Sequence, residues 1–384
     1  MYVSNVLKVL YSPRKTLKEV IQNPRYIGPL LIMLLLIAVN VASTYAVLSK
    51  EYYEQILPSG TKLDEWTENS TFWTSNANIT ESSDAINGSI YGNASIAFSI
   101  QNSPQVWMQL TGIGTVDCSV PNGFNLLSFR IKWTSPVTQP ENVTIQIFSL
   151  NSSSDYFYSD LKDTFSNATY NIWNNVTIPL DSSAWSGSSR NADWGNVTGL
   201  QLQFTWAGNS NVTLLVDGMF FHGPFKSLLE TGGASYLLDY GVSGAFQFII
   251  TWILLTGLIY VLVRAFKGKI FWKPMLIAVG FILMTMFVGA LINGIGYSTL
   301  PTIRFPFELI GGVQGEGTAA LNAISSQTWL VTQIGTVAEL LVWAWTAALA
   351  SLVVRAVAEF SWAKSVAVAI IAYVITIFIA GIIA

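Results

Sequence analysis

The chain has 384 residues, of which 51% are hydrophobic and 11% are charged, and its formal net charge is −3. Soluble domains carry about 25% charged residues, so this composition indicates a membrane protein and gives no basis for binding nucleic acid. One cysteine, Cys118, and one histidine, His222, exclude an intrachain disulfide framework and paired-histidine zinc sites. A Ser-His-Asp triad would have to use His222, and we expect no enzyme.

The N-terminal segment, residues 1–26, predicts a short amphipathic helix. Ser12 and Pro13 form a helix start, and Asn23-Pro24 ends the helix. Leu17, Val20 and Ile21 share one apolar face, and basic residues line the rest. We therefore expect this helix to lie on the cytoplasmic lipid surface, so that membrane lipid is a partner.

Five apolar stretches are long enough to cross a bilayer, which takes roughly 20 residues. The first is 27–48, and the other four lie within 240–384, at about 242–263, 274–297, 329–354 and 365–384. Lysine and arginine gather before the first span, in 264–273 and at 355–364. Because such residues favour the cytoplasmic side, the N-terminus is expected inside. Residues 50–228, the loop 298–328 and the C-terminus are then outside a multi-pass protein of the cell membrane.

The segment 50–228 shows the two-residue alternation of half-buried strands. In "LLSFRIKW", Leu127, Phe129, Ile131 and Trp133 share one face, and "LQLQFTW" alternates apolar residues with Gln201, Gln203 and Thr205. The predicted fold class is an α+β membrane protein. An extracellular all-β sandwich of the jelly-roll type is inserted between spans one and two of a five-helix bundle.

All N-x-[ST] sequons of the chain lie in this segment, and several are close together in "NITESSDAINGSIYGNAS". Their density predicts a glycoprotein, with polar composition alone as the alternative. Dense sequons with a single cysteine favour an archaeal-like surface. The predicted glycosylation sites are Asn69, Asn78, Asn87, Asn93, Asn142, Asn151, Asn167, Asn175, Asn196 and Asn211.

The stretches "FSNATYNIWNNVTIPLDSSAW" and "VTLLVDGMFFHGP" resemble jelly-roll modules of the carbohydrate-binding type. The resemblance implies a possible structural calcium ion at Asp217, the alternative being a solvated carboxylate. Trp185 and Trp194 lie in a stretch rich in Gly, Ser and Asn, so they are candidate ligand-binding residues, with core packing as the alternative. Trp133 and Trp206 are in register with inward residues and are expected in the core.

The fourth span contains Glu339, whose carboxylate would be costly in a bilayer unless it faces the bundle or is protonated. Asn293 in the third span and Gln333 are its candidate partners. Glu339 either serves as a transport site or forms an interhelical hydrogen bond that holds the bundle together. In the preceding outer loop, "FPFELI" is expected to dip into the membrane interface or to pack beneath the β domain.

The pattern of residues 1–48 and 240–384 resembles the Yip-domain family, the Ypt/Rab-interacting-protein-like five-span membrane proteins. Shared features are the "S-P-x-x-T-L-x-x-V-x-x-N-P" helix, the five spans and the basic loop leading into "KPMLIAVGFIL". The resemblance implies a role in vesicle traffic and contact with small GTPases. The large β segment departs from the pattern and puts that role in doubt.

Three classes of function remain open from the residues. The first is a non-enzymatic protein that presents its β-sandwich outside for binding glycans, a surface layer or a membrane partner. The second is a transporter or channel component that uses Glu339, and the third is a Yip-like organiser of membranes or traffic. We favour the first class.

Overall fold

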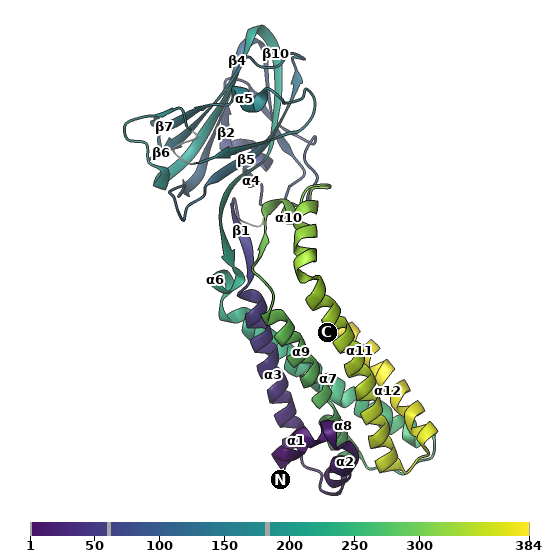
Figure 1. Ribbon diagram of the computed structural model, residues 1–384. Helices are drawn as coiled ribbons and strands as arrows, with labels where there is room; N and C mark the ends of the chain where they lie inside the picture. Colours follow the sequence, from purple (N-terminus) through teal and green to yellow (C-terminus); the bar gives the residue numbers. More distant parts are fainter. Residues whose placement is uncertain (1, 60–62, 181–184, 384) are drawn as a thin grey trace. The chain divides into compact units, whose positions relative to one another are not determined.

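The computed structural model describes residues 2–59, 63–180 and 185–383 (Figure 1). The chain forms two compact units, one of 53–226 with 304–323 and one of 1–52, 227–303 and 324–384. It therefore passes between the units four times, at 52/53, 226/227, 303/304 and 323/324. We call them the β unit and the helical unit.

The β unit is an antiparallel β-sandwich, which confirms the expected α+β class. Its short helices are α4 (Glu65–Glu68), α5 (Lys162–Phe165) and α10 (Phe307–Gly311), with 3-10 turns at Ser70–Phe72 and Trp194–Asn196. The strands are β1 (Glu51–Leu57), β2 (Trp73–Ser75), β3 (Asn78–Ser82), β4 (Ser95–Val116), β5 (Leu126–Ser135), β6 (Asn142–Ser149), β7 (Ser152–Asp160), β8 (Asn174–Pro179), β9 (Gly187–Ser188), β10 (Val197–Ser227) and β11 (Ile303–Phe305).

Two long strands, β4 and β10, organise the sandwich. They pair with each other from Val197 opposite Val116 to Val216 opposite Ile96, with register shifts around Ser210. The first half of β10 also pairs with β6, and its second half pairs with β5. Each long strand therefore serves two sheets, β2-β4-β10-β6-β7-β9 on one side and β3-β4-β10-β5-β8 on the other.

Alternation along the strands builds the core between these sheets. Phe129, Ile131 and Trp133 are fully buried, and Trp206 is 4% exposed, as the periodicity predicts. The indole nitrogen Nε1 of Trp133 has no hydrogen-bond partner among the described residues. Two further buried tryptophans of the β unit, Trp66 and Trp73, join the same core, and Trp73 Nε1 donates to the Trp66 carbonyl at 2.7 Å.

The segment 304–323 packs against the β-sandwich, as one of the two alternatives for "FPFELI" predicted. The Phe307 ring lies 4.7 Å from Phe220 and 6.2 Å from Tyr91, and the three form a small second core. Arg130 makes a bidentate ion pair with Glu316, at 2.9 Å from Nη1 and 2.6 Å from Nη2. This segment is therefore part of the β unit.

The helical unit contains α1 (Tyr2–Tyr11), α2 (Pro13–Gln22), α3 (Ile27–Leu48), α6 (Leu228–Gly232), α7 (Ala234–Ala265), α8 (Trp272–Ile282) and α9 (Met284–Ser298), α12 (Trp362–Ile383) and most of α11 (Thr318–Ala358). Among the described residues, five helical segments are long and apolar enough to cross a membrane, as expected: Ile27–Leu48, Ser235–Ala265, Trp272–Ser298, Thr318–Ala358 and Trp362–Ile383.

The N-terminal segment differs from the expected single surface helix. It folds into α1 and α2, with Ser12 as the N-cap of α2 and Pro13 in its first turn. Leu17 and Val20 are 1% and 5% exposed, and they pack with Val6 and Val9 into the core of the helical unit. The bundle therefore covers the apolar face of this segment, and the location of the segment at the lipid surface stays a prediction.

Candidate functional site

One face of the β-sandwich presents a continuous row of polar and aromatic side chains. Directly opposed residues of antiparallel strands point to the same side of a sheet. Register therefore aligns a row across six strands, from β2 to β9: Thr74, Gln109, Gln201, Gln146, Tyr158 and Gly187. At about 4.8 Å between strands, this row is roughly 24 Å long.

The neighbouring row contributes a second aromatic ring. It runs through Trp107, Gln203, Thr144 and Asp160 on β4, β10, β6 and β7. All four side chains are at least partly exposed, whereas Met108, Leu202 and Ile145 between the rows are fully buried on the opposite face. We call Trp107, Gln109, Gln146, Tyr158, Gln201 and Gln203 the glutamine face.

Most amides of the glutamine face have no partner in the part of the chain that the structure describes. Gln203 donates to Gln105 Oε1 at 3.3 Å, but no hydrogen bond is formed by the side-chain amides of Gln109, Gln146 or Gln201. Each such amide offers two donors and an acceptor. The surface can therefore bind a neutral, hydroxyl-rich ligand, and the rings of Trp107 and Tyr158 can stack on it.

Trp185 and Trp194 pack around Phe157, whose side chain points to the opposite side of β7 from Tyr158 of the glutamine face. Trp194 stacks on Phe157 at 3.7 Å and contacts Trp185 edge-on at 5.4 Å, and both pack against the core while remaining partly exposed. Trp185 Nε1 donates to the Pro179 carbonyl at 2.9 Å. Their ligand binding stays a prediction, and this packing favours the alternative of a structural role.

The sequon asparagines all lie on the surface of the β unit. None is buried: Asn69 and Asn196 are half-buried, and the other eight are exposed. The Asn69 side chain accepts a hydrogen bond from the Thr71 backbone at 2.9 Å. Every site is accessible to modification, and glycosylation itself remains a prediction.

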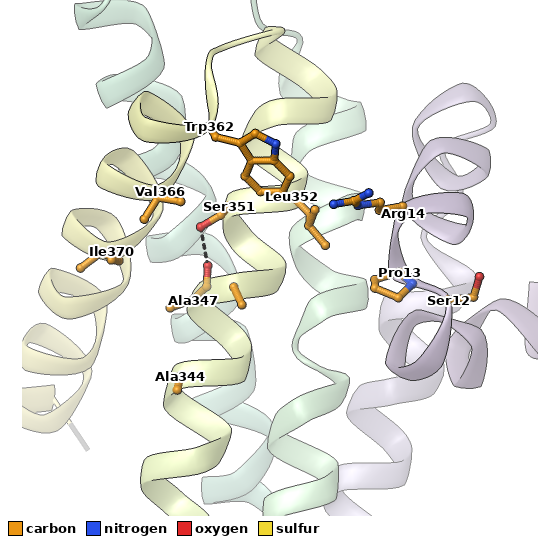
Figure 2. A pocket seen from close by; sticks show the side chains of 11 residues that line it. Ser12, Pro13, Arg14, Ala344, Ala347, Ser351, Leu352, Trp362, Val366 and Ile370 are labelled. Atoms are coloured by element: carbon orange, nitrogen blue, oxygen red, sulfur yellow. Dashed lines mark hydrogen bonds between the residues drawn. The ribbon is translucent and has the colours of Figure 1, made fainter.

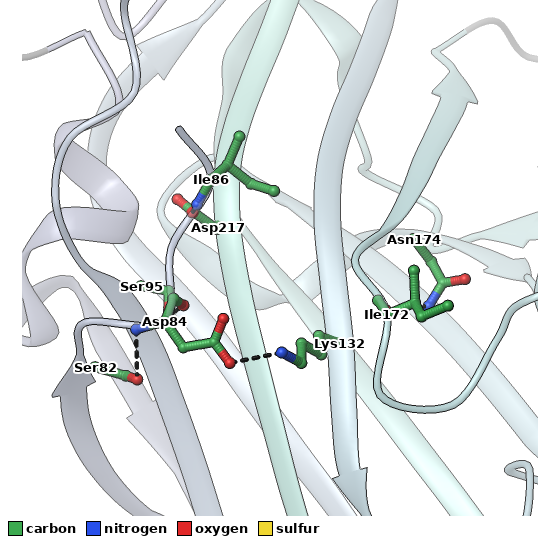
Figure 3. Close-up of polar contacts among 8 residues, drawn as sticks. All are labelled: Ser82, Asp84, Ile86, Ser95, Lys132, Ile172, Asn174 and Asp217. Atoms are coloured by element: carbon green, nitrogen blue, oxygen red, sulfur yellow. Dashed lines mark hydrogen bonds and ion pairs between the residues drawn. The ribbon is translucent and has the colours of Figure 1, made fainter. Parts of the chain in front are cut away.

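The surroundings of Asp217 do not fit a calcium ion. Its carboxylate is 1% exposed and accepts hydrogen bonds from the Ile86 backbone at 2.6 Å and from the Gly218 backbone at 2.7 Å (Figure 3). A third donor, Thr67 Oγ1, lies at 3.4 Å. Calcium needs six to eight oxygen ligands, and the described residues include no metal-binding group of three or more His, Cys, Asp or Glu. N–H and O–H donors satisfy this carboxylate instead.

Burial of Asp217 predicts an unusual pH dependence of stability. Burial raises the pKa of Asp217 to about 7 and that of Asp64 to about 6, and Glu68 adds repulsion to both. The folded state then keeps protons that the unfolded state loses near pH 4, so the free energy of unfolding decreases as the pH rises from about 4 to about 7. Between pH 5 and pH 8 we expect the β unit to lose roughly 4 kcal/mol, because the two carboxyls together account for about three pKa units above pH 5. Melting curves should show a shallower pH dependence in Asp217→Asn; parallel curves would contradict this assignment.

Ser128, His222 and Glu54 lie in the order of a hydrolase triad, an arrangement that the sequence analysis did not find. Ser128 Oγ is 2.6 Å from His222 Nε2, and His222 Nδ1 is 3.0 Å from Glu54 Oε1. However, Ser128 is 9% exposed, and the Phe307 ring packs on the imidazole at 4.8 Å. Glu54 also accepts the Phe307 backbone N–H at 2.6 Å. The network thus connects Ser128, through His222 and Glu54, to the 304–323 segment.

The three predicted polar residues of the spans do not come together. Glu339 is exposed on α11, and no hydrogen bond joins it to Asn293 or Gln333 among the described residues. Asn293 Oδ1 is buried without a partner and faces Gly335, one turn before Glu339. The buried positions of α11 near this point are Ala338 and Val342. Glu339 directly follows Ala338, and its side chain therefore points away from the helices that cover Ala338.

The fold thus defines a multi-pass membrane protein that carries a β-sandwich. Residues 199–384 match the Yip1 domain. This match confirms, for this part of the chain, the resemblance to the Yip-domain family that the sequence pattern indicated. The match begins within β10 and leaves out residues 1–48, where part of the resemblance was seen. The curated proteins contain no match.

The β-sandwich is similar to solved carbohydrate-binding modules. One is the family 11 module from Clostridium thermocellum in complex with a β-1,3-1,4-mixed-linked tetrasaccharide, with 15% identity, 44% of this chain and 95% of that chain covered, and a TM-score of 0.27. Another is the family 30 module of a Clostridium thermocellum cellulosomal cellulase, with 16% identity, 41% and 91% covered, and a TM-score of 0.28. At TM-scores below 0.5, no function follows from these similarities.

Proposed function

We propose that this protein is a non-enzymatic membrane protein whose β-sandwich binds neutral glycan chains outside the cell. The glutamine face carries this proposal, because it combines unpaired amides with two aromatic rings on a rigid sheet. All six of its residues are uncharged, and Tyr158 alone among them carries a hydroxyl, so this face suits binding rather than catalysis. Its length fits an extended chain better than a single sugar ring.

The test is binding of neutral oligosaccharides to the full-length protein in detergent, measured by calorimetry over a panel of β-glucans. Trp107→Ala and Tyr158→Ala should each weaken binding about fivefold, the factor for losing about 1 kcal/mol of ring stacking. Trp185→Ala is the matched control and should leave binding unchanged. Loss of binding in Trp185→Ala alone would instead support the site predicted from the sequence.

The absence of catalysis is a separate part of the proposal. It is supported by the packing of Phe307 over the Ser128–His222–Glu54 network. Covalent labelling of Ser128 by a fluorophosphonate probe would overturn it.

A further inference from the structure

A hollow of about 810 Å³ lies in the helical unit between α2, α11 and α12, within the volumes typical of ligand sites (Figure 2). One wall of this hollow is mostly apolar and comes from the two helices α11 and α12. The lining residues on that wall are Ala344, Ala347, Ala348, Leu352, Val366 and Ile370. The hollow exists because α11 presents alanines here, whose small side chains cannot fill the space beside α12.

The mouth of this hollow is basic and aromatic. A second hollow of about 400 Å³ adjoins it and shares Arg14, Leu352 and Trp362, adding Lys18 and Arg355. The guanidinium carbons of Arg14 and Arg355 lie 5.5 Å and 4.2 Å from the Trp362 ring. Figure 2 shows Arg14 on α2 pointing toward Trp362 across the mouth. One indole therefore lies beside two positive charges.

Among the residues that the structure describes, no carboxylate lies within ion-pair distance of these three cations. The ion pairs of the described residues join Arg130 with Glu316, Lys132 with Asp84 and His222 with Glu54, all in the β unit. No acidic residue lines either hollow. Arg14, Lys18 and Arg355 together form a concentrated positive site that an anionic group would neutralise.

The polar and apolar parts of the site are arranged along a helix axis. Ala344 precedes Arg355 by eleven positions, which is about 16 Å along α11. Arg355 and Trp362 stand where α11 ends and α12 begins, at the basic ends of the spans. A ligand here must be charged at one end and apolar over a considerable length, and it must be available within a membrane.

We propose that this site binds one anionic phospholipid from the surrounding bilayer. The phosphate of this lipid lies between Arg14 and Arg355 beside Trp362. One acyl chain occupies the alanine-lined part of the hollow, which we call the groove. A soluble phosphate compound would use only the mouth, and an acidic protein segment would leave the groove empty. The lipid therefore matches both halves of the site.

The experiment is native mass spectrometry of the full-length protein in detergent, titrated with dioleoyl phosphatidylglycerol or dioleoyl phosphatidylcholine. Wild-type protein should retain one phosphatidylglycerol in preference to phosphatidylcholine. Arg14→Gln and Arg355→Gln should each weaken phosphatidylglycerol about fivefold and together about thirtyfold. Arg264→Gln is the matched control, because Arg264 lies 5.5 Å from the Tyr260 ring but outside the hollow.

A second variant tests the groove. Ala348→Phe fills it and should weaken both lipids, while the melting temperature in detergent reports whether the bundle still folds. Unchanged phosphatidylglycerol binding in the double arginine variant overturns the proposal, as does unchanged binding in a folded Ala348→Phe. Displacement of the lipid by equal concentrations of glycerol phosphate, or by an acidic peptide, also overturns it, because either would assign the mouth to a soluble partner.

Discussion

Replacing Glu316 with alanine should destabilise the β unit by about 2–4 kcal/mol, because the buried guanidinium of Arg130 would lose its carboxylate partner. The Arg130 side chain is 9% exposed, and its other hydrogen-bond partner is the Tyr91 hydroxyl at 3.1 Å. Removing one partner of a buried ion pair costs about 3–5 kcal/mol. Glu316 is 31% exposed, so water offsets part of that loss.

The readout is thermal unfolding together with hydrogen exchange over residues 306–317. Loss of the ion pair should release this segment and expose the backbone bond from Ser89 N–H to the Gly311 carbonyl, which is 2.7 Å long. Asp84→Ala is the matched control, because Asp84 and Lys132 are also 2.6 Å apart but Asp84 is 45% exposed (Figure 3). Such surface pairs contribute about 0–1 kcal/mol. Equal losses in the two variants would contradict the argument.

Gly28→Val should destabilise the helical unit by about 1–3 kcal/mol or more through overpacking. A Cβ added at Gly28 on α3 would lie 2.0 Å from the Phe281 ring on α8, and Phe281 is itself 2% exposed. The contact is reciprocal, since a Cβ at Gly280 would lie 2.6 Å from the Pro29 ring. The two helices approach so closely only because both positions lack a side chain.

The measurement is the apparent melting temperature in detergent. Gly257→Val on α7 provides the control, because nothing lies within 4 Å of the Cβ that it would add. We expect a clear decrease for Gly28→Val and little change for Gly257→Val. If the two variants have the same apparent melting temperature, the close approach of α3 and α8 does not exist in the protein.

The parts of the fold that depend on local pattern could be predicted from the sequence. Alternation placed Phe129, Ile131 and Trp133 in the core, and hydropathy identified the five long apolar helices. An amphipathic pattern, however, does not distinguish a lipid surface from a protein surface. That is why Leu17 and Val20 were expected on the membrane but pack inside the bundle.

The candidate sites depend on contacts between distant residues, which no local pattern contains. Gln201 and Gln203 were visible as the polar side of a strand. Their neighbours Trp107 and Tyr158 follow only from the register of β4, β6 and β7. Likewise, the basic mouth of the lipid site joins Arg14 to Arg355, which lie at opposite ends of the chain.

The four passages of the chain between the two units have a consequence for shedding. A surface domain held by a single stalk is released by one protease cut in that stalk. Here a cut at any one of 52/53, 226/227, 303/304 or 323/324 leaves three covalent tethers intact. The segment 304–323 would in addition stay attached through Arg130 and the ring of Phe220. The β-sandwich therefore stays covalently joined to the helical unit after any single cut at these positions.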